Sequence, residues 1–232
     1  MSYYKLNNAY IDKYVSNLNV QVKENWEPNL VSENSLLDNK ISIVIPVYGE
    51  DDFYSLEKIL FKTFNKFLDI SSVHYIYLII DMTQQHFANK LINMYQNLPI
   101  KIIDQDTICT KSSSGWRFQQ ILKLGSCNIV NTKWYLLLDS DFFLTRRCGF
   151  NELIINDRAL VDLTTSQCLW NGKQKWCDNT YKIISPKSKN SNIPMMSVTP
   201  QIFNKFIVND LLNYISETYN ENWCNYLNKH SF

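Results

Sequence analysis

The sequence predicts an α/β fold, in which a single domain has a mostly parallel central sheet flanked by helices. Short apolar runs alternate along the chain with segments whose apolar residues recur at helical spacing, as expected of right-handed βαβ units. The apolar run Trp134–Leu138 also ends on two carboxylates, Asp139 and Asp141. Because ligands of open α/β sheets bind just beyond the carboxyl ends of the strands, this edge is the expected functional site.

The first two thirds of the chain contain the expected sheet. The β-branched run Ile41–Val47 predicts a central strand that Pro46 and Gly49 terminate, and Asp51 or Asp52 is expected to cap the following helix. That helix has apolar residues on one face, namely Phe53, Leu56, Leu60, Phe64 and Phe67. The expected elements then continue as strand Tyr75–Ile80, helix 84–97, strand Ile100–Ile103, helix Trp116–Leu124 and the strand that leads to Asp139.

The two flanks are less regular. Tyr3–Leu18 has the spacing of an amphipathic helix, and residues 19–39 are polar and predict a linker. After Asp141, short strands are expected at 158–165, 180–185 and Met195–Val198. Thr199-Pro200 predicts the start of a last long helix, because Thr is a good cap and Pro is favoured in the first turn.

Composition excludes several classes of protein. A length of 232 residues suits one domain, and a formal net charge of +1 gives no electrostatic basis for binding nucleic acid or an acidic membrane. No apolar run reaches transmembrane length and the N-terminus has no apolar signal region, so a soluble, cytoplasmic protein is expected. The six cysteines form no C-x-x-C pair and are expected to be reduced and mostly buried, Cys168 and Cys177 being the one pairing worth checking across a turn.

Two Asp-x-Asp triplets compete for a metal site. A carboxylate pair suits a hard divalent cation, which can in turn hold a diphosphate. Asp104-Gln-Asp106 follows a short strand, whereas Asp139-Ser-Asp141 follows the longer apolar strand and a helix, as a βαβ crossover requires. The later triplet is therefore preferred, although an Asx-type turn at a strand end would also account for either one.

The chain resembles the GT-A (Rossmann-like) fold of nucleotide-sugar glycosyltransferases. Ile41–Tyr48 is similar to their opening strand, and Gly115-Trp-Arg-Phe-Gln-Gln-Ile-Leu-Lys123 is similar to the G-W-x-x-Q-Q-x-L-K segment that precedes D-x-D in a bacterial and phage group. Met196-Ser-Val-Thr-Pro200 matches a later segment of that group, and residues 1–40 have no counterpart. The resemblance divides the chain into an N-terminal helix and linker (1–40), a nucleotide-sugar-binding half (41–145) and a small acceptor-side half (146–232).

The resemblance implies a metal-dependent enzyme that transfers a sugar from a nucleoside-diphosphate sugar, a UDP-sugar, to a glycan or other hydroxyl acceptor with Mn²⁺ or Mg²⁺. It assigns nucleotide contacts to Pro46, Val47, Tyr48, Asp81, Arg117, Gln120, Lys123 and Asp139. It assigns metal contacts to Asp139, Asp141 and His230, and Arg117 would add a bidentate contact to phosphate.

The acceptor side is assigned fewer residues. If transfer inverts configuration, a carboxylate base is needed, and Glu217 is the candidate with Asp178 as the alternative. Trp170 and Trp176 are candidates for an aromatic acceptor platform, as against a folded-over hydrophobic lid.

Three other functions compete with this one. Nucleotide-sugar pyrophosphorylases need a Gly-rich loop after the first strand, and Val47-Tyr-Gly-Glu-Asp-Asp is not one. A degenerate GT-A domain that binds nucleotide or glycan without turnover is compatible with the short C-terminal half. A nuclease that uses paired acids is the third alternative, and it is disfavoured because the net charge of +1 gives no sign of a basic surface for nucleic acid.

Overall fold

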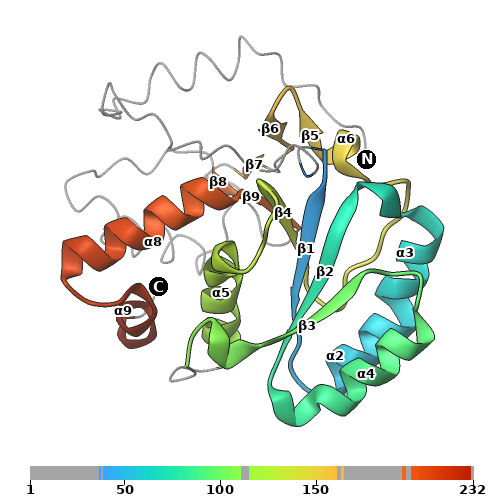
Figure 1. Ribbon diagram of the computed structural model, residues 1–232, viewed down its shortest axis with the longest axis horizontal. Helices are drawn as coiled ribbons and strands as arrows, with labels where there is room; N and C mark the ends of the chain where they lie inside the picture. The colour runs from blue at the N-terminus through green and yellow to red at the C-terminus, as the bar shows by residue number, and fades with distance from the viewer. Residues whose placement is uncertain are drawn as a thin grey trace.

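The computed structural model describes residue 37, residues 39–110, 115–160 and 200–230, and the strand pairing of 163–164 and 195–196. Its centre is a five-stranded sheet of order β3-β2-β1-β4-β9 (Figure 1). The strands are β1 Ile41–Pro46, β2 Val73–Ile80, β3 Ile100–Asp104, β4 Trp134–Leu137 and β9 Gln201–Asn204. β1 to β4 are parallel to one another and β9 is antiparallel to β4, so the predicted mostly parallel α/β sheet is confirmed.

Successive side chains of the central strands enter two separate cores, because strand residues alternate between the faces of a sheet. In β1, Ile41, Ile43 and Ile45 pack in one core, whereas Val44 packs in the other. β4 repeats this alternation, with Leu136 in the first core and Leu137 in the second. Both faces are therefore covered, which is why these strands are mostly apolar throughout rather than alternating with polar residues.

The first core is covered by α2 Glu50–Ser55, α3 Phe61–Phe67 and α4 Gln85–Met94. α2 and α3 are joined by a π-helical turn, Leu56–Leu60, so the helix predicted from Phe53 to Phe67 is continuous but locally widened. Phe53 of α2 and Phe87 of α4 stack with ring centroids 5.3 Å apart. This layer lies opposite α5, α8 and α9 in Figure 1.

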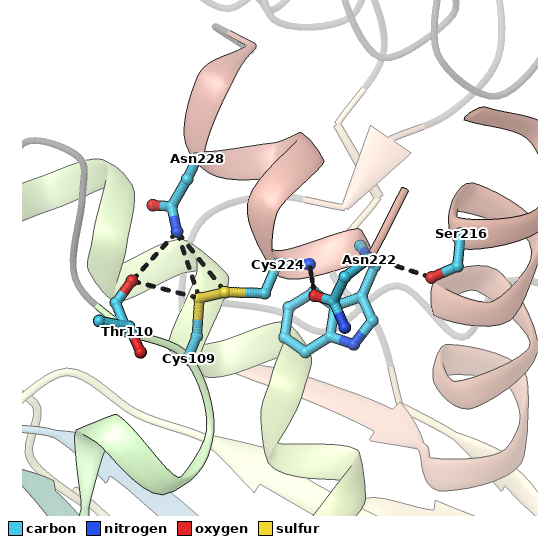
Figure 2. Close-up of a disulfide and its surroundings, with 7 residues drawn as sticks. Cys109, Thr110, Ser216, Asn222, Cys224 and Asn228 are labelled. Carbon is cyan, nitrogen blue, oxygen red and sulfur yellow. Dashed lines mark hydrogen bonds between the residues drawn. A yellow bond between two sulfur atoms is a disulfide. The ribbon is translucent and has the colours of Figure 1, made fainter. Parts of the chain in front are cut away.

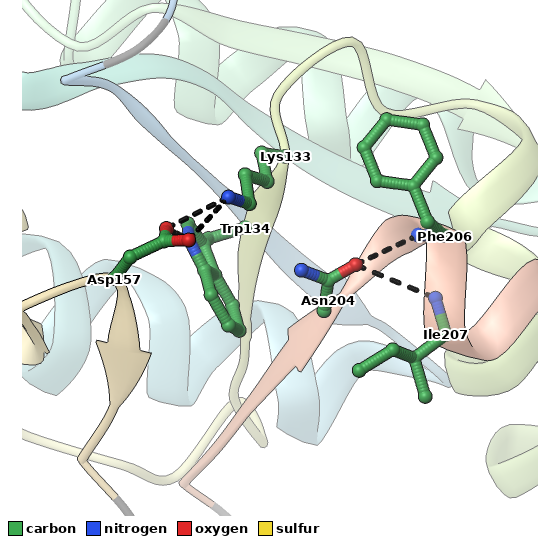
Figure 3. Close-up of polar contacts among 6 residues, drawn as sticks. All are labelled: Lys133, Trp134, Asp157, Asn204, Phe206 and Ile207. Atoms are coloured by element: carbon green, nitrogen blue, oxygen red, sulfur yellow. Dashed lines mark hydrogen bonds and ion pairs between the residues drawn. The ribbon is translucent and has the colours of Figure 1, made fainter. Parts of the chain in front are cut away.

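The second core is covered by α5 Gly115–Gly125, α8 Lys205–Tyr219 and α9 Trp223–Lys229. The predicted helix start at Thr199-Pro200 is wrong. Gln201–Asn204 instead forms the edge strand β9, whose Phe203 pairs with Tyr135 of β4. Asn204 is the true N-cap of α8, since its side-chain oxygen accepts from the backbone N–H of Phe206 at 3.0 Å and of Ile207 at 3.4 Å (Figure 3).

Shorter elements follow β4. α6 Phe150–Leu153 leads into the hairpin β5 Ile154–Ile155 and β6 Arg158–Ala159, and β7 Leu163–Thr164 pairs with β8 Met195–Met196. The hairpin turn is anchored to β4, because Asp157 forms an ion pair with Lys133 at 2.6 Å and accepts from the Trp134 indole at 3.4 Å (Figure 3). Strands are thus confirmed within 158–165 and 195–198, and the predictions for 1–36 and 180–185 lie outside the described residues.

The expectation of reduced cysteines is wrong for one pair. Cys109, just before α5, and Cys224 of α9 form a disulfide with Cα atoms 5.9 Å apart (Figure 2). The Asn228 amide donates to Cys109 Sγ at 3.3 Å and to the Thr110 carbonyl at 3.2 Å, so α9 is tied to the segment before α5 by hydrogen bonds as well. Cys168 and Cys177 lie outside the described residues.

Cys127 and Cys148 are the free thiols of the described part of the chain, and we expect both to resist alkylation in the folded protein. Burial raises the pKa of the Cys127 thiol to about 12 and that of Cys148 to about 11, so the reactive thiolate is scarce at pH 8. Peptide-resolved mass spectrometry after iodoacetamide treatment checks this, with urea-unfolded protein as the positive control. Fast labelling of either residue in the native protein would contradict the expectation.

Within the ranges that the structure describes, no helix is both long enough and apolar enough to cross a lipid bilayer.

Candidate functional site

The carboxyl ends of the four parallel strands meet at one edge of the sheet, and three of them have an acid at the strand end or within two residues of it. β2 is followed by Asp81, β3 ends on Asp104, and Asp139 lies two residues after β4. The register keeps the strand ends level, since Ile80 pairs with Asp104 and Val44 pairs with Leu137. This edge therefore concentrates negative charge, which favours cations and groups that donate hydrogen bonds.

Asp139 is paired with a buried cation. The ammonium of Lys123 lies 2.6 Å from Asp139 Oδ1, and the Lys123 side chain is 5% exposed whereas that of Asp139 is 36% exposed. Helical side chains lean toward the N-terminus of their helix, which lets a residue late in α5 reach back to the carboxyl end of β4. The pair neutralises one acid of the triplet and leaves part of the Asp139 carboxylate accessible.

The middle residue of the triplet is held from the opposite layer. Ser140 is buried, and its hydroxyl donates to Asp52 Oδ1 at 2.5 Å. The other oxygen, Asp52 Oδ2, accepts from the backbone N–H of Tyr48 at 2.7 Å. One carboxylate of α2 thus joins the end of β1 to the segment after β4, where Phe142 N–H donates to the Asp139 carbonyl at 3.3 Å and closes a turn.

The acids after β2 and β3 both form local turns. Asp81 Oδ1 accepts from Thr83 N–H at 2.9 Å and its hydroxyl at 2.7 Å, and Asp104 Oδ1 accepts from Asp106 N–H at 3.1 Å. The Asx-type turn that competes with a metal site at the earlier triplet therefore forms at Asp104. Buried Gln105 donates to Asp81 Oδ2 at 3.3 Å, which links the two strand ends.

The residues expected near a nucleotide on the first strand are at this edge. Pro46 ends β1, Val47 is buried and hydrogen-bonded to β2 through its backbone, and the Tyr48 side chain is 59% exposed. Gly49 follows with φ of 87°, a left-handed conformation that glycine adopts without strain, and its N–H donates to Gln84 at 3.3 Å. The chain therefore turns sharply from the strand into α2 and leaves the Tyr48 ring toward solvent.

The residues of α5 face in different directions. Arg117 Nη2 donates to the carbonyl of Leu227 at 3.0 Å and also to that of His230, so its guanidinium binds the last carbonyls of α9. Gln120 is half-buried and the Trp116 ring is exposed, whereas Lys123 points into the molecule. Lys123 thus contacts the triplet, through its ion pair with Asp139.

Few of the described side chains at this edge could act as ligands of a divalent cation. Asp141 is exposed and Asp139 has one oxygen on Lys123, and within the described ranges no three His, Cys, Asp or Glu side chains form a metal-binding cluster. His230 instead packs against Tyr226 with ring centroids 4.3 Å apart. Two carboxylates nevertheless fit Mg²⁺ or Mn²⁺, because such ions often take one or two carboxylates and complete their shell with phosphate oxygens and water.

The acceptor-side candidates are only partly described. Glu217 is exposed near the end of α8. Trp170, Trp176 and Asp178 lie outside the described residues.

Sequence reasoning missed Asp52 and Ser140 as parts of this edge. Asp52 was expected only as a possible helix cap, but the N-cap of α2 is Gly49 and Asp52 instead binds Tyr48 and Ser140. One signal was available, since Glu50-Asp51-Asp52 supplies three acids to a helix start that needs one.

The chain belongs to a family of unknown function (DUF6492), whose model matches residues 38–232. No curated protein matches the sequence.

Among solved structures, the chain is similar to S. aureus TarS 1-349 in complex with UDP, at 18% identity and a TM-score of 0.39, over 74% of this chain and 48% of that one. The same protein in complex with UDP-GlcNAc matches at 14% identity and a TM-score of 0.38, over 74% and 47%. The 4-diphosphocytidyl-2C-methyl-D-erythritol synthase of Anaerococcus prevotii matches at 11% identity and a TM-score of 0.36, over 82% and 86%. The chain spans less than half of the TarS structures, and at these TM-scores the likeness does not assign a function.

Proposed function

We propose that this member of the family is a glycosyltransferase that binds a nucleoside-diphosphate sugar, a UDP-sugar, at the carboxyl edge of the sheet and transfers the sugar to a hydroxyl acceptor. The observation that carries the proposal is the Asp139–Asp141 turn, which presents an exposed acid while Lys123 and Asp52 hold the residues before it. The resemblance of Gly115–Lys123 and the following D-x-D to a glycosyltransferase motif points to the same chemistry.

In this proposal the nucleotide lies across the ends of β1, β2 and β4. Tyr48 offers an exposed ring for contact with the base, and Asp81 is an acceptor for uracil or ribose groups. The accessible part of Asp139 serves as an acceptor for a ribose hydroxyl. Asp141, with Asp139, would hold Mg²⁺ or Mn²⁺, which supplies Lewis-acid stabilisation to the departing diphosphate when bound.

The remaining assignments concern transfer. Glu217 is the proposed base that takes the acceptor proton if configuration is inverted. Arg117 reaches a phosphate only if its Nη2 leaves the carbonyl oxygens of Leu227 and His230, so substrate binding at Arg117 would be coupled to the end of α9. Gln120 is a further proposed nucleotide contact, and His230 is a further proposed metal ligand.

The decisive experiment is calorimetric titration of UDP with and without Mn²⁺. We expect Asp141→Asn to lower the metal-dependent affinity for UDP by roughly tenfold or more, about 1.4 kcal/mol, because the variant loses an anionic ligand while keeping its shape. Asp106→Asn is the matched control, since Asp106 is also exposed and is the second acid of the other triplet. A loss confined to Asp106→Asn would transfer the site to β3, and no binding of any nucleoside diphosphate by the native chain would contradict the proposal.

Turnover separates a transferase from a domain that only binds. The native chain is expected to release UDP from at least one UDP-sugar in the presence of Mn²⁺, by slow hydrolysis when no acceptor is added. Tight UDP binding without such release, over a panel of UDP-sugars, would favour the binding module.

A further inference from the structure

We infer that Asp52 is a positioning residue of the candidate site, whose carboxylate fixes the Asp139–Asp141 turn relative to the end of β1. The effect of Asp52 on nucleotide binding rests on the proposed function. Its effect on the turn rests on the described contacts alone.

The two carboxylate oxygens of Asp52 accept hydrogen bonds from different parts of the chain. Oδ2 accepts from the N–H of Tyr48, the residue before the N-cap of α2, and this bond satisfies a backbone donor at the helix start. Oδ1 accepts from the Ser140 hydroxyl, 88 residues later in the chain, and that bond contributes nothing to α2. The start of the helix therefore accounts for one of the two bonds and not for the other.

The second bond controls the turn between the two acids. Ser140 is 5% exposed, so its hydroxyl needs a protein partner, and a bond to an ionised carboxylate is shorter and stronger than one between neutral groups. Asp139 is already held by Lys123 from α5. With Asp52 acting from α2, the turn is held by side chains from both helical layers, while Asp141 is exposed and Asp139 is partly exposed.

The same carboxylate also couples the two ends of the proposed ligand. Tyr48 follows β1, where a base would lie, and Asp141 follows β4, where a diphosphate would lie. Because Asp52 binds the backbone of Tyr48 and the side chain of Ser140, the neighbour of Asp141, losing it removes a link that restrains the distance between Tyr48 and Asp141. Asp52 is thus expected to act on affinity without touching the nucleotide.

Three variants distinguish the effect of Asp52 on the Asp139–Asp141 turn from its effect on the start of α2 and from the loss of a negative charge. Ser140→Ala removes only the bond to the turn and keeps the bond to Tyr48. Asp52→Asn weakens both bonds while keeping the side-chain shape. Asp51→Asn is the control, because Asp51 is the adjacent exposed acid of the same helical turn and its replacement removes the same charge.

Hydrogen exchange followed by mass spectrometry measures the turn directly. We expect peptides that cover residues 138–143 to exchange at least threefold faster in Ser140→Ala and Asp52→Asn than in the native chain, with the Asp51→Asn protein unchanged. In the same proteins, calorimetric UDP affinity should fall about three- to tenfold in the first two variants only. Peptides from β2 and α4 should exchange as in the native chain, which excludes general loosening of the fold.

The outcomes distinguish the two proposals. Unchanged exchange at 138–143 in both variants would overturn the positioning role whatever the nucleotide result. Faster exchange with unchanged UDP affinity, in a native chain that binds UDP, would overturn the role of Asp52 in the site while leaving the proposed function intact. If residues 138–143 exchange faster in the two variants but the native chain binds no nucleoside diphosphate, the role of Asp52 in holding the turn is supported and the proposed function is rejected.

Discussion

Replacing Asp139 by alanine is expected to lower the free energy of unfolding by about 3 kcal/mol, more than replacing its partner Lys123 by methionine. The two side chains differ in exposure, at 36% for Asp139 and 5% for Lys123. Without Asp139 the ammonium of Lys123 is left buried and unpaired, which is the costly way to break an ion pair. Without Lys123 the carboxylate of Asp139 can still be hydrated, and the methionine side chain fills much of the vacated space.

Urea denaturation of both single variants and of the double variant Asp139→Ala/Lys123→Met measures this asymmetry. The double variant should be more stable than Asp139→Ala alone, because it no longer contains a buried unpaired charge. Equal losses in the two single variants, or a larger loss in Lys123→Met, would contradict the central role of the buried cation. Because Asp139 variants combine instability with any loss of binding, Asp141 is the cleaner residue for testing nucleotide binding.

The parallel strands were predictable because they are buried on both faces. A short run that is apolar at nearly every position, such as Ile41–Val47, fits a buried strand better than a surface segment, and the helices between strands show their packing faces through spacing. The start of α8 was not predictable in the same way. Thr199-Pro200 is a good helix start, but pairing of Gln201–Asn204 with β4 outweighs it, and Asn204 provides a second cap four residues later.

In the candidate site too, some residues could be identified from the sequence, whereas the contacts between them could not. Asp139 and Asp141 were identified because their position after a strand is a property of the sequence. The burial of Lys123 and the bond from Ser140 to Asp52 were not, since each joins residues of different elements and depends on how helices lie on the sheet. The orientation of Arg117 toward α9 has the same origin, because its acceptors are more than a hundred residues later.

The disulfide could not be predicted from spacing for a further reason. Its cysteines are 115 residues apart, and neither belongs to a short motif. Six cysteines allow 15 full pairings, and the chain is long enough to fold around a core without any. Only the docking of α9 against the segment before α5 brings Cys109 and Cys224 within bonding distance.

Removing that disulfide, by Cys109→Ala together with Cys224→Ala, is expected to lower the free energy of unfolding by up to about 5 kcal/mol. The reason is the long loop that the bond closes, since a cross-link over 115 residues removes a large part of the conformational entropy of the unfolded chain. The Asn228 amide also loses its sulfur acceptors but keeps the Thr110 carbonyl, so α9 should remain docked. The variant is therefore expected to fold with a lower melting temperature rather than to unfold.

Thermal and urea unfolding of the native and double-alanine chains, each with and without reductant, tests this directly. Reductant should lower the stability of the native chain toward that of the variant and leave the variant unchanged. Cys127→Ala is the control, because Cys127 is a buried free thiol whose loss leaves the cross-link in place. If reductant had no effect on the native chain, Cys109 and Cys224 would not be cross-linked in solution. α9 would then be held against α5 by Arg117, Asn228 and apolar packing alone, and UDP affinity should be the same with and without reductant.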